Sequence, residues 1–179
     1  QQSRTPPPRT FTGLYTCLTQ TILTQYLNDH PQYTGGGYTL DTVFDLHIPH
    51  PVHNYFKELC RIAFEHVSDQ QLIFPDLPKE LHDLGFTDAV PELLLYQQSA
   101  NYSYNFLHLS VQEFLAAYHV SLINCTKQEQ WLSIYKRCWS PFENVLRFVA
   151  GITKFQGLNK MAVKQAIDIE IGRASCRER

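Results

Sequence analysis

The fold is decided by the stretch Phe106-Leu107-His108-Leu109-Ser110-Val111-Gln112-Glu113-Phe114-Leu115-Ala116-Ala117, where a β-like segment runs directly into a helix. Ser110 and Glu113 have the spacing of a capping box, in which two side chains each accept from a first-turn amide. Apolar residues then recur on one helical face, at Val111, Phe114, Leu115, Tyr118 and Leu122. The pattern predicts a helix from Val111 to about Ile123. His108 stands at the junction, where an imidazole beside exposed N-terminal amides can meet an anion.

Two further amphipathic helices are predicted before this stretch. The first begins at Thr10 or Thr12, ends near Asn28 and carries a stripe of Leu14, Leu18, Ile22 and Tyr26, with Cys17 beside it. The second begins near Pro51, because proline suits the first helical position. Its stripe is Val52, Phe56, Leu59, Ala63 and Val67, widened by Tyr55 and Ile62. Residues 32–46 lie between the two helices, contain Gly35-Gly36-Gly37 and are predicted to form a flexible loop.

Short strands are predicted between the second helix and His108. Gln71 to Phe74 is expected to form a strand ended by Pro75, and Leu77 to Leu84 a short helix with Gly85 as its C-cap. Leu93 to Tyr96 and Tyr102 to Phe106 are predicted as the two strands of a hairpin or wing. Helix, strand, short helix, hairpin and helix is the order of a winged-helix module. The predicted fold class is therefore mainly α with a small β-hairpin, a winged-helix module flanked by helical segments.

The chain after Thr126 has a helical pattern throughout. Trp131, Ile134, Tyr135 and Cys138 form one stripe. The run Ser140-Pro141-Phe142-Glu143 predicts a second capping box, with proline at the first helical position. Val145, Leu146, Val149 and Ile152 are expected to fill the buried face of that helix.

The sequence carries no recognisable catalytic motif. A G-x-x-x-x-G-K-[ST] loop for nucleotide phosphates and a G-x-S-x-G nucleophile elbow are both missing. His47, His50 and His53 are spaced by three, but Pro49 and Pro51 interrupt a helix there, so a solvated loop is favoured over a metal site. The four cysteines before the last ten residues form no C-x-x-C pair, which argues against a zinc ribbon and fits a reducing compartment. These cysteines are Cys17, Cys60, Cys125 and Cys138.

Charge and hydropathy exclude two classes of partner. The formal net charge is −2 with neutral histidines, so the chain lacks the basic field that nucleic acid or anionic lipid attracts. No apolar run reaches about 18 residues, so no membrane span is predicted.

Both ends of the sequence suggest an internal fragment. The chain starts at Gln1, and its one methionine is Met161. Glu170 to Arg179 matches, residue for residue, the translation of a sequencing adapter, and we leave it out of the fold prediction.

Three segments resemble parts of the NACHT-type NOD-like receptors. Pro8 to Tyr15 is similar to the entry into the last helices of the family's first helical domain. Phe106 to Ala117 resembles the end of its winged-helix domain, and Asn144 to Ile152 its second helical domain. The resemblance implies a first helical domain with the Gly-rich loop at 1–48, a winged-helix domain at 49–124, the start of a second helical domain at 125–169 and an adapter artefact at 170–179. The Gly-rich loop itself has no match in the family.

The resemblance also implies a function. In this family the winged-helix histidine of an F-x-H motif contacts the β-phosphate of ADP, and that role falls on His108. The family's P-loop and Mg²⁺-binding carboxylates would precede Gln1, so ADP or ATP is expected in the intact protein only, and the fragment is not expected to be an enzyme. The expected partners are an upstream nucleotide-binding domain, downstream leucine-rich repeats and, on activation, further copies of the protein. A cytoplasmic location is implied, and no catalytic or metal site.

Three alternatives stay open. A winged-helix DNA-binding regulator is disfavoured, because the segment Leu77 to Leu84 holds Glu80 and Asp83 and is acidic on balance. A second alternative is a helical interaction scaffold that binds no ligand. The sequence separates it from a receptor only through the motifs quoted above. His108 itself can be read as a histidine at the edge of the core that donates to a nearby carbonyl. A fragment of a multidomain receptor is also expected to expose apolar faces, at Leu14 to Tyr26 and around Phe148.

Overall fold

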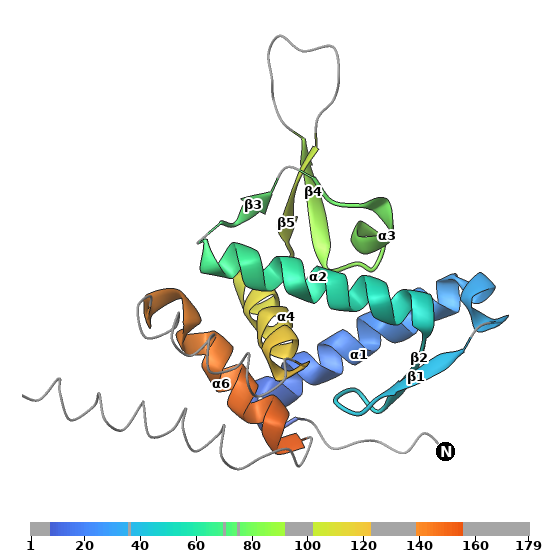
Figure 1. Ribbon diagram of the computed structural model, residues 1–179, viewed down its shortest axis with the longest axis horizontal. Helices are drawn as coiled ribbons and strands as arrows, with labels where there is room; N and C mark the ends of the chain where they lie inside the picture. The colour runs from blue at the N-terminus through green and yellow to red at the C-terminus, as the bar shows by residue number, and fades with distance from the viewer. Residues whose placement is uncertain are drawn as a thin grey trace, which may run out of the picture.

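The computed structural model describes residues 8–35, 37–69, 71–74, 76–91, 102–122 and 139–155. The helices are α1 (Phe11–Asp29), α2 (His50–Ser68), α3 (Lys79–His82), α4 (Leu109–Leu122) and α6 (Trp139–Phe155), with a 3₁₀ turn η1 at Pro31–Gly35. The strands are β1 (Tyr38–Asp41), β2 (Leu46–Pro49), β3 (Ile73–Phe74), β4 (Thr87–Pro91) and β5 (Tyr102–Phe106). The protein is thus mainly helical with small antiparallel sheets, as predicted (Figure 1).

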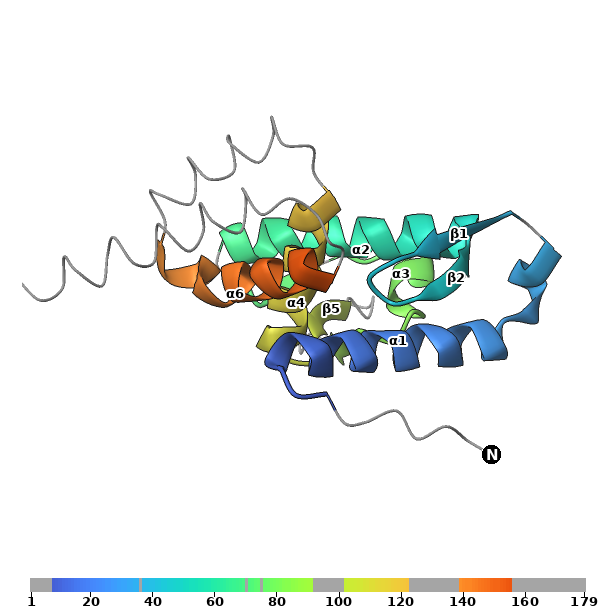
Figure 2. The ribbon, with the colours of Figure 1, turned by 90° about the horizontal axis from the view of Figure 1, so that it is seen from below.

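Helix α4 lies at the centre of the fold. Each residue from Val111 to Tyr118 is buried, on all sides of the helix. Helices α2 and α6 pack along it, and Figure 2 shows α1 and α2 on opposite sides of the structure with α4 between them. The predicted helix is confirmed, although Leu122, the last residue of the predicted stripe, is 41% exposed.

Helix α1 forms where predicted, but its buried face differs from the prediction. Thr10 caps it, with Oγ1 accepting from the Gly13 amide at 3.0 Å. Leu14 and Leu18 are 52% and 40% exposed. The buried residues are instead Thr12, Gly13, Thr19, Leu23 and Tyr26. The apolar exposure predicted for this helix is therefore found at its first half.

Helix α2 confirms its prediction in full. Pro51 lies in the first turn. All five residues of the predicted stripe are buried: Val52, Phe56, Leu59, Ala63 and Val67. Tyr55 and Ile62 pack against the core at its edge.

The predicted loop at residues 32–46 is wrong, because this segment forms η1 and most of a β-hairpin. Strands β1 and β2 pair antiparallel, from Tyr38 opposite Pro49 to Asp41 opposite Leu46. The turn between them carries Asp45 at φ 48°. Its apolar residues Val43 and Phe44 are 6% and 1% exposed, so the turn is anchored in the core rather than solvated. The hairpin lies beside the start of α2 (Figure 1).

The second sheet has the strand order β3-β5-β4. Phe74 of β3 is opposite Tyr104, and Thr87 of β4 is opposite Phe106. The helix predicted from Leu77 to Leu84 is shorter, α3 spanning only Lys79–His82, and its C-cap is Asp83 rather than Gly85. Gly85 has φ 87° in the turn that follows, where its amide donates to the His82 carbonyl at 3.0 Å. The first strand of the hairpin begins at Thr87, two residues after this glycine, which the sequence did not indicate. The strand predicted at Leu93 to Tyr96 lies outside the described residues.

Helix α6 begins at Trp139, two residues before the predicted first position, so Ser140 already lies within the helix. The predicted face is confirmed, with Val145, Leu146 and Ile152 buried and Val149 packed at the edge of the core. Phe148 is 1% exposed, so the prediction of an exposed apolar face around it is wrong. The stripe predicted from Trp131 to Cys138 lies outside the described residues.

From α2 to α4 the elements follow the predicted order of helix, strand, short helix, two strands and helix. Their assignment to a winged-helix module stays a prediction. In the described part of the chain, no helix is both long enough and apolar enough to cross a membrane.

Candidate functional site

His108 lies between the end of β5 at Phe106 and the start of α4 at Leu109. Its carbonyl accepts from the Val111 amide at 2.9 Å and the Gln112 amide at 3.2 Å, which are the first bonds of the helix. Its ring nitrogen Nδ1 accepts from the Ser110 amide at 3.1 Å. The side chain is exposed. His108 therefore caps the helix itself, with an imidazole nitrogen in place of the usual hydroxyl or carboxylate.

The cap bond fixes the tautomer of His108. A backbone amide can only donate, so Nδ1 must carry a lone pair, and in a neutral ring the proton is then on Nε2. No described residue forms a hydrogen bond with Nε2 of His108. The exposed side chain thus carries an Nε2 N–H donor without a hydrogen-bond partner among the described residues, beside the first turn of α4.

The surroundings of His108 are apolar and exposed. Leu107 is 45% exposed and Leu109 is 49% exposed. The backbone here is held in place, because the Leu107 amide donates to the Phe86 carbonyl at 3.1 Å. His108 therefore has an exposed apolar side chain on each side of it in the sequence.

The predicted capping box of Ser110 and Glu113 is wrong. Ser110 lies inside the first turn, and Glu113 is 5% exposed and turned to α6. Asn144 Nδ2 of α6 donates to both carboxylate oxygens of Glu113, at 3.1 and 3.2 Å. Burial raises the pKa of Glu113, and the bonds from Asn144 and the nearby His108 oppose that rise only in part. Glu113 therefore joins α4 to α6.

An aromatic junction (Phe11, Tyr15, Phe114 and Phe148) lies where α1, α4 and α6 meet. Phe148 is at its centre, with ring centroids 5.2 Å from Phe11, 5.2 Å from Tyr15 and 5.3 Å from Phe114. Tyr15 and Phe114 are 5.9 Å apart. Ring pairs at such distances add to the stabilisation from burial.

The same junction brings the three receptor-like segments together. Phe11 and Tyr15 belong to the first segment, Phe114 to the second and Phe148 to the third. A Cβ added at Gly151, also in the third segment, would collide with the side chain of Thr12 in the first. The close approach of α1 to α6 therefore depends on glycine at this position. The first segment thus packs against two segments that follow it by more than 90 residues in the sequence.

A second polar cluster, the Asp41 cluster (Asp41, His53 and Tyr118), is buried. Asp41 Oδ1 accepts from the Val43 and Phe44 amides at 3.0 and 3.3 Å, an Asx turn. Its Oδ2 accepts from the Tyr118 hydroxyl of α4, and His53 Nε2 of α2 lies 3.6 Å away. Burial alone would raise the pKa of Asp41, but these groups together hold it below its ordinary value. The sequence analysis missed this cluster; its one signal is an aspartate directly before an apolar turn.

The histidines considered for a metal site do not gather. His47 lies in β2, His50 begins α2, and His53 is 5% exposed rather than solvated as predicted. Among the described residues, no three histidine, cysteine or acidic side chains could hold a metal ion. Burial raises the pKa of the Cys60 thiol well above its ordinary value, so Cys60 near Asp41 is not an activated nucleophile.

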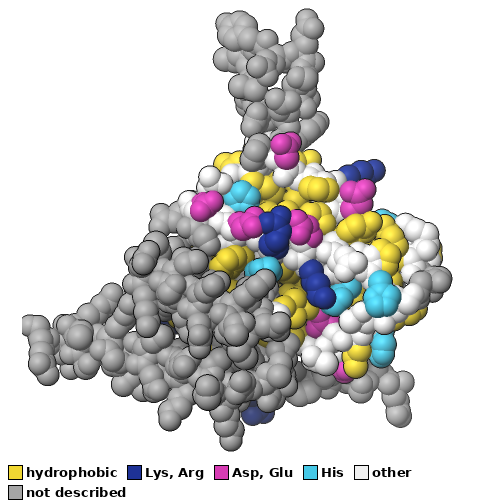
Figure 3. All heavy atoms as spheres, viewed as in Figure 1, with side chains coloured by type: hydrophobic (Ala, Val, Ile, Leu, Met, Phe, Trp, Pro, Cys, Tyr) yellow, Lys and Arg dark blue, Asp and Glu magenta, His cyan; other side chains and the backbone are white. Residues whose placement is uncertain are grey.

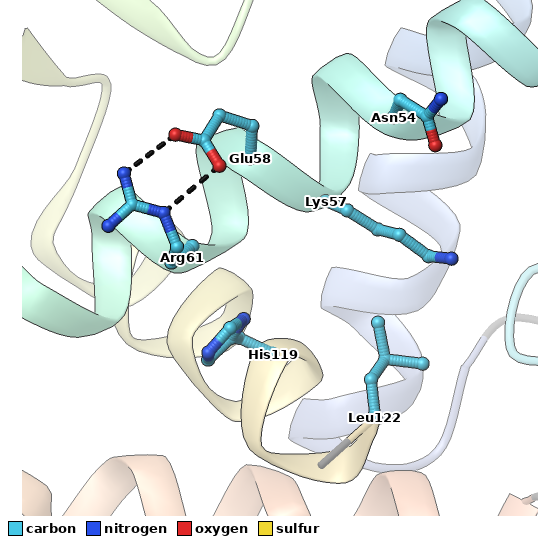
Figure 4. Close-up of a pocket in the computed structure, with 6 residues that line it drawn as sticks. All are labelled: Asn54, Lys57, Glu58, Arg61, His119 and Leu122. Atoms are coloured by element: carbon cyan, nitrogen blue, oxygen red, sulfur yellow. Dashed lines mark hydrogen bonds and ion pairs between the residues drawn. The ribbon is translucent and has the colours of Figure 1, made fainter.

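A shallow groove of about 390 Å³ runs between α2 and the end of α4, lined by Asn54, Lys57, Glu58, Arg61, His119 and Leu122. Arg61 donates to Glu58 at 3.0 and 2.6 Å and also to Glu65, while Lys57 extends along α2 away from that pair (Figure 4). Figure 3 shows basic and acidic side chains side by side on this face of the molecule. Because Arg61 is neutralised by two carboxylates, it adds little to anion binding in the groove, and the start of α4 at His108 is the stronger candidate for an anion site.

The segment considered for DNA recognition forms a single helical turn, α3, which carries Lys79, Glu80 and His82. Comparison with models of known protein families finds no match to this chain, and comparison with curated proteins finds none either.

Proposed function

We propose that this chain is the regulatory module of a NACHT-type innate-immune receptor in the cytoplasm. In this proposal His108 donates a hydrogen bond from Nε2 to the β-phosphate of ADP, which is held by the nucleotide-binding domain of the same protein. The chain itself has no catalytic activity, since the phosphate-binding loop belongs to that other domain.

The observation that carries the proposal is the orientation of the His108 ring. Its Nδ1 is occupied by the Ser110 amide, so the neutral ring carries its proton on Nε2, and the side chain is exposed. Hydrogen bonds from such donors to phosphate oxygens are among the stronger ones, because the acceptor is ionised.

The surroundings of His108 also suit a phosphate. Helix α4 spans Leu109–Leu122, and its N-terminal end carries the positive end of the helix dipole. Leu107 and Leu109 give the site an apolar rim, which would exclude water once a neighbouring domain covers it. The packing of the three receptor-like segments into one junction gives further support, because it agrees with the resemblance from which the role of His108 was taken.

The mechanism is a two-state switch. In the resting state the contact from His108 ties the module to the nucleotide-binding domain, and the junction of α1, α4 and α6 carries that tie to the adjoining helices. Exchange of ADP for ATP removes the contact, and the domains rotate apart and assemble with further copies. Leucine-rich repeats that follow the module would supply the sensing surface.

The test replaces His108 in the intact receptor and measures the rate of ADP release together with basal signalling. His108→Asn places an oxygen where Nδ1 was, so it keeps the helix cap and loses the outward donor. His108→Gln places an amide N–H near the position of Nε2 and loses the cap. We expect His108→Asn to release ADP at least about tenfold faster and to raise basal signalling, and His108→Gln to retain ADP better than His108→Asn.

The control is His47→Ala, because His47 is exposed on β2, away from the end of α4. It should leave ADP release unchanged. The proposal fails if His108→Asn and His108→Ala both release ADP at the rate of the unaltered receptor.

A further inference from the structure

The β1–β2 hairpin has few attachments to the rest of the protein. Among the described residues, its two strands pair with one another and with no third strand. A two-stranded hairpin of this kind is marginally stable by itself, so its docking must depend on the side chains at its turn. The chain reaches the hairpin through three consecutive glycines, Gly35 to Gly37, and leaves it through Pro49 into α2.

Apolar side chains supply one part of the docking. Phe44, 1% exposed, inserts between α2 and α4, with its ring centroid 5.6 Å from Phe56 and 5.2 Å from Tyr118. It also lies 6.5 Å from Phe114 of the aromatic junction. Val43 and Ile48 are buried beside it.

The other part is the carboxylate of Asp41. Its two oxygens hold the turn amides of Val43 and Phe44 on one side and the Tyr118 hydroxyl on the other, with His53 nearby. One side chain thus joins the hairpin to both α2 and α4.

We propose that the β1–β2 hairpin is a strap that opens as a unit, and that the ionised carboxylate of Asp41 is the clasp that keeps it closed. Opening would withdraw Phe44 from between α2 and α4 and uncover Phe56 and Tyr118. The proposal is independent of any nucleotide and of the role of His108.

Protonation of Asp41 is expected to weaken this clasp. The titratable groups that face Asp41 are His53 and Cys60 on α2 and Tyr118 on α4. Because the pKa of Asp41 is below its ordinary value in the folded chain, its contribution is complete above that ordinary value. It is lost as the pH falls through the lowered pKa. Protonation leaves a neutral acid, which is a weaker acceptor for the turn amides and the tyrosine.

Native-state hydrogen exchange on the full chain, at a series of low denaturant concentrations, tests the strap. We expect the amides of β1 and β2 to exchange through an opening that depends weakly on denaturant, whereas α4 amides exchange through one that depends strongly on it. Asp41→Asn should speed exchange in the hairpin at least about tenfold, with the weak denaturant dependence kept.

The matched control is Asp45→Asn, which makes the same chemical change four residues away in the same hairpin. Asp45 is exposed, and asparagine tolerates its positive φ. The hairpin amides of the Asp45→Asn variant should exchange at the same rate as those of the unaltered chain. The strap is refuted if the hairpin and α4 amides share one opening with one denaturant dependence. The role of Asp41 as the clasp is refuted if the hairpin amides exchange no faster in Asp41→Asn than in Asp45→Asn.

Discussion

Two histidines beside α4 have opposite environments. His53 is 5% exposed and faces the carboxylate of Asp41, which is itself buried and also accepts from Tyr118. His108 is exposed, and one of its ring nitrogens accepts from the Ser110 amide while the other has no hydrogen-bond partner among the described residues. Burial and the number of internal partners, rather than residue type, separate a group that holds the fold from one that can bind a ligand.

The same contrast predicts how much folding stability is lost when each residue is replaced. Around Asp41, donors from three elements converge on one carboxylate, so removing it leaves buried polar groups without partners. Replacing His108 removes only one cap hydrogen bond, and that bond lies at the surface. The following predictions test this contrast.

Asp41→Ala should have the largest effect. It leaves the Tyr118 hydroxyl, the turn amides and His53 without their acceptor in the core, and should lower the free energy of unfolding by about 3 kcal/mol. Denaturant unfolding at neutral pH measures this. Asp45→Asn in the same hairpin should stay within about 0.5 kcal/mol of the unaltered chain. A loss for Asp41→Ala as small as that would mean that the cluster contributes little.

The pH dependence of stability should identify the same carboxylate. The pKa of Asp41 is lowered in the folded chain, so the unfolded chain binds the proton first, and folding stability falls as the pH drops through the acid range. The stability difference between the unaltered chain and Asp41→Asn should therefore shrink on acidification. A difference that stays constant from neutral pH to about pH 3 would contradict the ionised clasp.

The contribution of Glu113 to folding stability should depend on pH in the opposite direction, and its effect should be smaller. Its pKa is raised by burial, so its contribution is favourable below the ordinary pKa of glutamate and is lost as the pH rises through the folded value. Glu113→Gln removes the buried charge and keeps an oxygen for Asn144. It should be neutral or stabilising by less than about 1 kcal/mol at pH 7, with no gain at about pH 4. Thermal unfolding at the two pH values measures the difference, and a clear destabilisation at pH 7 would show that the carboxylate is needed in its ionised form.

His108 should have the smallest effect on stability. His108→Ala removes the helix cap and should cost about 1 kcal/mol, whereas His108→Asn keeps the cap and should stay within about 0.5 kcal/mol. Denaturant unfolding of the two variants decides this. A large loss in His108→Asn would make His108 a structural residue like His53.

Helices α1 and α2 show how far spacing alone predicts burial. The predicted stripe of α2 includes a step of three residues, from Phe56 to Leu59, among its steps of four, and it stays on one face. The predicted stripe of α1 advances by four throughout, from Leu14 to Tyr26, so it drifts around the helix by about 40° at each step. Only its end reaches the core, and Leu14 and Leu18 stay exposed.

The polar groups were harder to predict, because their partners are distant in the sequence. Ser110 and Glu113 have the spacing of a local cap, yet Glu113 pairs with Asn144, and His108 takes the cap position. Asp41 follows a glycine-rich stretch that suggests a loop, and its partners Tyr118 and His53 lie on other elements. The position of His108 at the exposed start of a helix was predictable, because the strand before it and the helix after it both have strong sequence patterns. The orientation of its ring was not.

The proposed contact of His108 with ADP can be tested most directly in the full-length protein by labelling with diethyl pyrocarbonate, which modifies accessible imidazole nitrogens. Mass spectrometry then compares the labelling with and without ADP. The account predicts that His53 is unreactive in both states, that exposed His47 is labelled equally in both, and that His108 is labelled without nucleotide and protected when ADP is bound. Equal labelling of His108 in the presence and absence of ADP would contradict it.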